Sequence, residues 1–296
     1  MTRRRVALVA AAVFVLASGA VVRNQVKVYR GRLARVAAMQ ASHPVKPLPR
    51  EVTAERQALF AMLQPVAITN CELERFGERN DGGYLMCGNL LDAVQAGYSY
   101  GISGYDGWGC EISNRSTIPI HQYDCFNTDR PWCFRGETVF HEECVAGTAA
   151  TIDGRPFDTV QGQFARNGDS AKRIVLKIDV EGAEWDTLLA MPDETLQQID
   201  QMAVEFHWEE DAALGWAHDA RYTRAVARLK QFFEVGHIHY NNASCIGDLA
   251  PFPSFAYEVL FVSKRLAVVD RARPAIRLHE DDAKNNWALP DCQSGG

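Results

Sequence analysis

The sequence lacks several patterns that would place it quickly in a functional class. It has no internal repeat, no low-complexity tract and no GxGxxG loop of the kind that binds dinucleotides. None of its eight cysteines forms a CxxC pair, which argues against a structural zinc site. Positive charge is not in excess, because 31 Lys and Arg stand against 37 Asp and Glu, a net charge of -6. A nucleic-acid-binding surface is therefore not indicated.

The chain is long enough for one large core, or for one domain with an appendage, at 296 residues of which 47% are hydrophobic. An even number of cysteines after a secretory-type segment predicts disulfides and an oxidising compartment. Reduced, mostly buried cysteines are the alternative, and the spacing does not assign pairs. The cysteines are Cys71, Cys87, Cys110, Cys125, Cys133, Cys144, Cys245 and Cys292.

The N-terminus carries a targeting or anchoring element. Val6–Val22 is apolar and uncharged, and basic residues flank it. As a helix it would span about 25 Å, which is marginal for a bilayer. We predict that residues 1–22 are an uncleaved anchor of a single-pass membrane protein, or a signal peptide cleaved near Ala17–Ala20, which would make the protein secreted or periplasmic. The flanking basic residues favour a cytoplasmic domain, whereas the cysteines favour the opposite side.

Composition divides the rest of the chain. Residues 23–64 are expected to be a stalk or linker, because Pro44, Pro47 and Pro49 fall within six positions before a helix at Glu51–Leu63. The main domain is expected to cover residues 65–270 and a C-terminal tail residues 271–296.

Strand and helix signals alternate through the main domain. The near-continuous apolar run Ile174–Ile178 is typical of a parallel strand covered on both faces. Alternation in units of about 30 residues predicts a doubly wound, mostly parallel α/β sheet, and the last two strands should form a terminal antiparallel hairpin. We predict strands at Tyr84–Cys87, Ala96–Ile102, Ile118–Tyr123, Thr138–Val145, Ile174–Ile178, Met202–Phe206, Val235–Tyr240 and Tyr257–Val262, and helices at Glu111–Arg115, Glu184–Leu189 and Ala220–Phe233.

A glycine-rich loop, Gly101–Gly109, follows the strand Ala96–Ile102. Glycines let a backbone approach a ligand, and amides near a helix N-terminus can bind it. Asp124 ends the next strand, where a carboxylate can accept the hydroxyls of a nucleoside ribose. A flexible surface turn and an ordinary turn residue are the alternatives.

Acidic residues gather directly after the strand Ile174–Ile178. Asp179 and Glu181 alternate along the chain, so both can face the crevice where open α/β sheets bind ligands. Burial there would raise the pKa of a carboxyl group, which suits a base or a hydrogen-bond acceptor. Capping of the following helix by Asp179 or Glu181 is the alternative.

Histidines mark two later strands. Glu205 and His207 share one strand face, and His207 is a candidate general base because imidazole titrates near neutral pH. A histidine satisfied within the core is equally compatible. His237 and His239 alternate on another strand, but a polar strand face explains them as well as a metal does. We therefore expect no metal site.

Four segments occur in a fixed order over roughly residues 70–265. They are Asp81-Gly82-Gly83-Tyr84; Tyr98-Ser99-Tyr100-Gly101-Ile102 leading to Glu111; Leu176-Lys177-Ile178-Asp179-Val180-Glu181-Gly182-Ala183-Glu184; and His239-Tyr240-Asn241-Asn242 before Tyr257-Glu258-Val259. With them the sequence resembles the FkbM-like S-adenosylmethionine-dependent methyltransferases, and more closely their membrane-anchored or secreted methyltransferase-like branch. The third segment is quite specific and the others are supportive.

The resemblance implies a seven-stranded Rossmann-like sheet with S-adenosylmethionine as cofactor. It implies O-methylation of a sugar, glycan or other small hydroxylated acceptor. Asp124 would bind the ribose, and Asp179 and Glu181 would lie beside the methyl-transfer site. The residues that would cradle the methionine part are Gly101, Ser103 and Gly104, and the candidate bases for the acceptor oxygen are Asp179, Glu181 and His207.

Two other functions compete with methyl transfer. The glycine loop lacks the acidic-x-Gly-x-Gly-x-Gly form usual in these enzymes, which favours a non-catalytic, membrane-tethered binding or scaffold protein with the same fold. A metal-dependent nucleotide-sugar transferase is weakened by the lack of an Asp-x-Asp motif at the relevant strand end.

Overall fold

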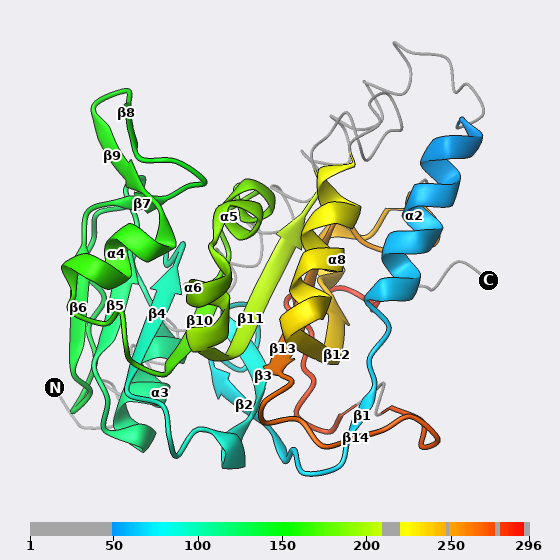
Figure 1. Ribbon diagram of the computed structural model, residues 1–296, viewed down its shortest axis with the longest axis horizontal. Coiled ribbons are helices and arrows are strands. Elements are labelled where there is room, and N and C mark those ends of the chain that lie inside the picture. The colour runs from blue at the N-terminus through cyan, green and yellow to red at the C-terminus, as the bar shows by residue number, and fades with distance from the viewer. Residues whose placement is uncertain (1–48, 209–219, 247–248, 276–278, 293–296) are drawn as a thin grey trace, which may run out of the picture. The chain divides into compact units, whose positions relative to one another are not determined.

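The computed structural model describes residues 49–208, 220–246, 249–275 and 279–292. These residues belong to one compact unit that begins at Pro49 (Figure 1). The predicted anchor at residues 1–22 and the first part of the predicted stalk lie outside the described residues. Within the described ranges, no helix is long and apolar enough to cross a membrane.

A seven-stranded mixed sheet forms the centre of the unit. From edge to edge it contains β12 (Phe233–Tyr240), β13 (Ala256–Ser263), β11 (Ile199–His207), β10 (Ile174–Ile178), β4 (Ala96–Tyr100), β5 (Ile120–Tyr123) and β6 (Thr138–His141). The five strands from β11 to β6 are parallel, and β13 is antiparallel to both of its neighbours. The predicted α/β class with a mostly parallel sheet is confirmed, and the sheet is compatible with a Rossmann-like fold. The expected antiparallel pair is β12–β13, with β13 inserted between β12 and β11.

The strand register brings three carboxyl ends together. Ile178, the last residue of β10, is paired with Tyr100 on one side and with Val204 on the other. Since β11 continues to His207, its last residues extend beside the segment that follows Ile178. The acidic segment after β10 is therefore flanked by the loop after β4 and by the end of β11.

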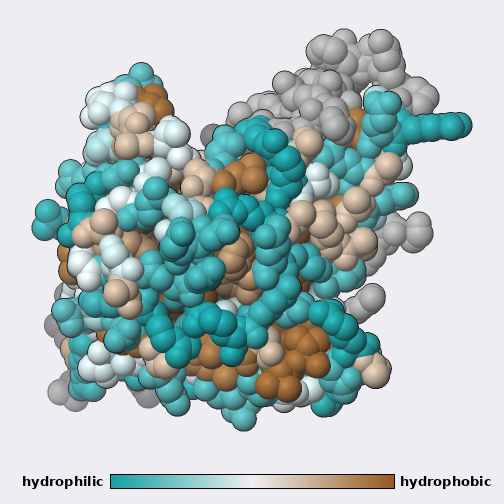
Figure 2. Space-filling view, in the orientation of Figure 1, coloured by the Kyte–Doolittle hydropathy of each residue, from teal (hydrophilic) through white to brown (hydrophobic). Residues whose placement is uncertain are grey.

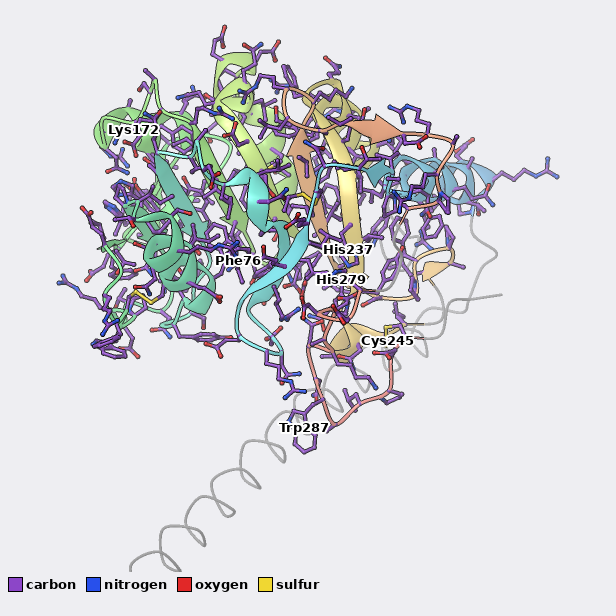
Figure 3. The ribbon with its side chains drawn as sticks, turned by 90° about the horizontal axis from the view of Figure 1, so that it is seen from below. Phe76, Lys172, His237, Cys245, His279 and Trp287 are labelled. Carbon is purple, nitrogen blue, oxygen red and sulfur yellow. A yellow bond between two sulfur atoms is a disulfide. The ribbon has the colours of Figure 1, made fainter. Side chains whose placement is uncertain are left out.

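Helices cover one face of the sheet, and a helix with a hairpin covers the other (Figures 1 and 3). Trp185, Phe206 and Leu229 belong to the first core layer, whereas Trp108 and Met86 belong to the second. The first layer holds α2 (Arg50–Met62), α4 (Val160–Arg166), α5 (Glu184–Ala190), α6 (Asp193–Gln198) and α8 (Arg221–Phe232). The second layer holds α3 (Gly107–Ser116), β2 (Leu73–Gly77) and β3 (Gly83–Cys87). The surface over the first layer is mainly hydrophilic (Figure 2).

Several predicted boundaries differ from the structure. The predicted strand Thr138–Val145 is divided between β6 and β7 (Cys144–Val145), because β7 leaves the central sheet to pair with β9 (Arg155–Asp158). The helix expected at Glu111 begins earlier, at Gly107 inside the glycine loop, where the Asp106 side chain accepts the amide of Gly109 at 2.9 Å. The remaining short elements are β1 (Ala67–Ile68), η1 (Gly88–Leu90), β8 (Ala150–Ile152), η2 (Asn242–Ser244) and β14 (Val269–Asp270).

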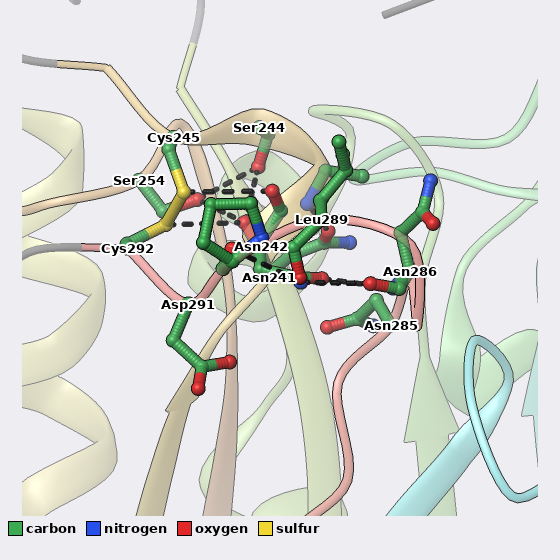
Figure 4. The surroundings of a disulfide bond; sticks show 12 residues. Asn241, Asn242, Ser244, Cys245, Ser254, Asn285, Asn286, Leu289, Asp291 and Cys292 are labelled. Carbon is green, nitrogen blue, oxygen red and sulfur yellow. Dashed lines mark hydrogen bonds between the residues drawn. A yellow bond between two sulfur atoms is a disulfide. The ribbon is translucent and has the colours of Figure 1, made fainter. Parts of the chain in front are cut away.

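All eight cysteines form disulfides, which confirms the expectation drawn from their even number. The pairs are Cys71–Cys87, Cys110–Cys133, Cys125–Cys144 and Cys245–Cys292. Bonded cysteines cannot serve as zinc thiolates or remain as buried free thiols. The last pair joins segments 47 residues apart and fixes the C-terminal segment against η2 (Figure 4).

Segments expected to be peripheral also pack against the domain. In α2, which lies within the predicted stalk, Leu59 is fully buried, as is Leu63 just after it. At the other end, Asn285 and Asn286 of the predicted tail are about 95% buried. The globular unit is therefore larger at both ends than residues 65–270.

Candidate functional site

The turn after β10 is organised by a buried glutamate. Glu181 and Gly182 both have positive φ, 53° and 114°. The two carboxylate oxygens of Glu184, which is fully buried, accept the amides of Val180 and Gly182, each at 2.9 Å. Glu184 thus stabilises the turn that precedes α5. The helix itself has no side-chain cap among the described residues, so the capping considered for Asp179 or Glu181 is not found. The carboxylates of Asp179 and Glu181 are available for other partners.

Glu184 also orients His207 at the end of β11. The Nδ1 atom of His207 lies 3.0 Å from Glu184 Oε1. The Nε2 atom faces carboxylate oxygens of Glu181, Glu205 and Asp179 at 3.7, 3.8 and 4.0 Å. The sequence candidates Asp179, Glu181 and His207 are therefore brought together, with Glu205 added.

The electrostatic environment of His207 favours its charged form. Burial acts to lower the pKa of His207, but the hydrogen bond and charge of Glu184 outweigh it, and the charges of Glu205 and Asp179 add to the effect. The result raises the pKa of His207 to about 10. At neutral pH the imidazole of the ligand-free protein is protonated, so the neighbouring carboxylates are the readier proton acceptors.

Glu205 and Asp179 share a tyrosine. The hydroxyl of Tyr84, from β3, donates to Asp179 Oδ2 at 3.0 Å and lies 3.4 Å from Glu205 Oε2. Asn241 donates to Glu205 Oε1 at 2.8 Å, and Lys177 Nζ lies 3.3 Å from Asp179 Oδ2. Burial raises the pKa of Glu205 well above its ordinary value, and the charge of Asp179 raises it further.

Two more carboxylates extend this cluster toward the hairpin and β13. Asn285 donates from its single amide nitrogen to Asp81 Oδ1 at 3.1 Å and to Glu258 Oε1 at 2.7 Å. Burial raises the pKa of both carboxyl groups. Asp81 and Glu258 were not candidate site residues, although both stand in the segments that carry the family resemblance. Asn285 gave no signal in the sequence.

The histidine pair of β12 has a partner other than a metal. His237 Nε2 lies 3.2 Å from Asp282 Oδ2, and His239 Nδ1 lies 2.8 Å from Oδ1 of the same residue. His239 Nε2 also lies 2.9 Å from Asn285 Oδ1. A cavity of about 10 Å³, room for a single water, adjoins this pair. His237 and His239 therefore anchor the C-terminal segment.

The glycine loop lies directly against the acidic turn. Gly101 has a φ of +73°, and a Cβ built on it would come within 1.6 Å of the Asp179 carbonyl oxygen. Lys177 of β10 links the ends of β10 and β4, because its Nζ donates to the carbonyls of Gly101 at 2.8 Å and Tyr100 at 3.2 Å. Only glycine permits this approach at position 101.

Asp124 holds the other side of the loop. Its Oδ2 accepts the amide of Ser103 at 2.8 Å, and its Oδ1 accepts the amides of Phe126 and Asn127 at 2.8 and 3.0 Å. Ser103 and Gly104 both have positive φ, 47° and 86°. Three backbone amides thus occupy most of the acceptor capacity of Asp124. The carboxylate fixes the loop. Of these three hydrogen bonds only one goes to Oδ2, so this oxygen could accept one more.

Comparison with known proteins adds no relative. No protein-family model matches the chain, and no curated protein matches it. The relation to FkbM-like methyltransferases therefore stays a prediction that rests on the motifs of this sequence.

Proposed function

We propose that the domain is an S-adenosylmethionine-dependent methyltransferase that acts on a hydroxyl group of a sugar, glycan or other small acceptor. The observation that carries the proposal is the contact between Gly101 and Asp179, since it makes a ligand-approachable loop and an acidic cluster neighbours at one edge of the sheet. The insertion of β13 between β11 and β12 supports it, because a terminal antiparallel pair is common in Rossmann-like methyltransferases.

Cofactor binding is assigned to the ends of β4 and β5. The left-handed backbone at Gly101, Ser103 and Gly104 turns the loop tightly above β4, which suits contact with the methionine part. The remaining acceptor position of Asp124 suits one ribose hydroxyl. S-adenosylmethionine would supply the methyl group as a sulfonium substituent.

The chain's own residues would orient and deprotonate the acceptor. Positioning is the main contribution of a protein to methyl transfer, and an oxygen acceptor also needs a base. Asp179 is the best candidate base because its side chain is 24% exposed, within reach of a substrate, and Tyr84 and Lys177 fix its orientation. Protonated His207 would hold the carboxylates around it in place.

A non-catalytic binding or scaffold protein is the second candidate. The observation in its favour is that three backbone amides already bind Asp124. Such a protein would keep the fold and the loop geometry without cofactor affinity.

The compartment is part of the proposal. With four disulfides, we infer that the domain works in an oxidising environment, either anchored by residues 1–22 or secreted. A cofactor made in the cytosol would then have to be imported to reach it.

Isothermal titration of the full-length chain with S-adenosylmethionine tests the proposal. We expect micromolar binding that is lost in Asp124→Ala and kept in Asp129→Ala, which removes a carboxylate from the same loop. Absence of binding by folded protein with intact disulfides would remove the methyltransferase assignment and favour the scaffold.

A further inference from the structure

Three side chains at the ends of β10 and β11 surround one small space. Asp179, Glu205 and His207 each direct one ligand atom into it, and these atoms lie within 4.8 Å of one another. A cation with ligands about 2.1 Å away separates neighbouring ligand atoms by about 3–4 Å. The His207 Nε2 distances to Glu205 and Asp179, 3.8 and 4.0 Å, already lie in that range.

The orientation of His207 points to a ligand in this space. Its side chain is only 8% exposed, and its Nε2 makes no hydrogen bond within the described residues, because the nearest oxygens stand 3.7 to 4.0 Å away. Its Nδ1 is held by Glu184. A carboxylate on the second ring nitrogen is the usual support of a metal-bound histidine, where it fixes the ring and strengthens the ligand.

The two carboxylates are supported in a similar way. Glu205 is bound by Asn241. Asp179 uses Oδ2 for Tyr84 and Lys177, whereas its Oδ1 faces His207 Nε2 and has no hydrogen bond among the described residues. A nitrogen and an oxygen that make no hydrogen bond among the described residues thus face each other at 4.0 Å, between the partly buried carboxylate of Asp179 and the buried carboxylate of Glu205. A cation between them would compensate those charges.

We propose that Asp179, Glu205 and His207 bind one divalent transition-metal ion of the Mn²⁺ or Zn²⁺ type. An imidazole together with two carboxylates suits these borderline ions, whereas Ca²⁺ takes six to eight oxygen ligands. Three protein ligands leave coordination positions open.

A proton on His207 Nε2 is the competing occupant of the space. It would also face the three carboxylates, and Lys177 would supply further positive charge nearby. Metal binding would displace that proton. The two occupants therefore differ in whether added metal stabilises the protein.

Thermal unfolding of the full-length chain distinguishes them. After chelator treatment and dialysis, without cofactor or acceptor, Mn²⁺ or Zn²⁺ at about a hundred-fold excess over Kd should raise the Tm by about 5–10 °C. Ca²⁺ at the same concentration should not. Titration of Mn²⁺ followed by electron paramagnetic resonance should give one bound ion per chain.

Variants tie the effect to the three residues. Asp179→Asn and His207→Gln should lose the Tm rise, whereas Asp186→Asn and His141→Gln, an acidic residue and a histidine outside the cluster, should keep it. Near-ultraviolet circular dichroism confirms that each variant is folded. No Tm rise in the wild-type chain, or an equal rise in His207→Gln, overturns the metal site. Because neither assay involves methyl transfer, metal binding can hold even if the proposed function fails.

Discussion

The backbone of Gly101 lies against the peptide carbonyl of Asp179, so that a Cβ on the glycine would stand 1.6 Å from the carbonyl oxygen. The loop after β4 and the turn after β10 thereby touch without a side chain between them. The glycine loop therefore packs directly on the residue whose carboxylate belongs to the acidic cluster. The glycine loop and the acidic turn therefore form one continuous packing unit.

Gly101→Ala should destabilise the fold by at least about 3 kcal/mol, because a left-handed φ and a clash with backbone add together. Gly168→Ala is the matched control. Gly168 has nearly the same φ, +75°, and no atom of the residues that the structure describes lies within 4 Å of its Cβ position. Its loss should be about 1 kcal/mol. Denaturant unfolding measures both, and equal losses would mean that the close approach imposes no constraint.

Tyr84→Phe should lower the free energy of unfolding by about 1–2 kcal/mol, because the partly buried carboxylate of Asp179 loses a hydroxyl donor. Tyr105→Phe is the control: Tyr105 is 47% exposed and its hydroxyl stands 3.5 Å from the Asp81 carbonyl. Its loss should be near zero. An unchanged free energy of unfolding in Tyr84→Phe would show that the hydroxyl contributes nothing to the cluster.

Asp179→Asn should lower kcat for methyl transfer by about 100-fold or more, since an amide cannot accept the acceptor proton. Asp186→Asn, an exposed acidic change on α5 that pairs with Arg221, should leave kcat unchanged. The measurement uses an acceptor identified by screening sugars and other hydroxylated compounds. Undiminished turnover in Asp179→Asn would remove this residue from the mechanism.

Replacing Cys245 and Cys292 together by serine should cost about 2–4 kcal/mol, because the 47-residue separation closes a long loop. Hydrogen exchange should increase locally in residues 279–292, where Asn242 binds the carbonyls of Asn286 and Leu289. Serine at Cys110 and Cys133 serves as control and should leave exchange in that segment unchanged. Equal exchange in both variants would show that the disulfide does not hold the segment.

Acid should destabilise the protein through His141. Burial lowers the pKa of His141 from 6.5 to about 4, with the charges of His121 and Arg166 adding to the effect. Between pH 6.5 and about 4, His141 is protonated in the unfolded chain but neutral in the folded chain. The free energy of unfolding is therefore unaffected by this group above pH 6.5 and decreases as the pH falls toward 4. His141→Gln should therefore lose less stability than wild type over this range. Parallel curves from denaturant unfolding would contradict the assignment.

The central sheet could be predicted because its signals are local. The run Ile174–Ile178 is apolar except for Lys177 and forms β10 with the same bounds. The position of the acidic residues could also be predicted, since Asp179 and Glu181 directly follow this strand in the sequence. The division of Thr138–Val145 between two sheets could not be predicted, because it depends on the pairing of Cys144 with Phe157 in β9, and the sequence did not indicate β9 as a strand.

The completed site depends on contacts between distant segments. Asn285 binds Asp81 across 204 residues, and a single asparagine near the C-terminal end carries no pattern that indicates such a partner. In the sequence, nothing distinguishes Glu184 from the neighbouring acidic residues Asp179 and Glu181. Only the positive φ of Glu181 and Gly182 makes it the residue that stabilises the turn.

The C-terminal segment sets an order of assembly during synthesis. Residues 279–292 leave the ribosome after every strand of the seven-stranded sheet, yet Asn285 supplies the amide hydrogens that Asp81 and Glu258 accept. A nascent chain that ends before this segment lacks the amide that donates to both of these carboxylates. The acidic cluster is therefore completed by residues that are synthesised last, in the same segment that the Cys245–Cys292 disulfide attaches next to η2.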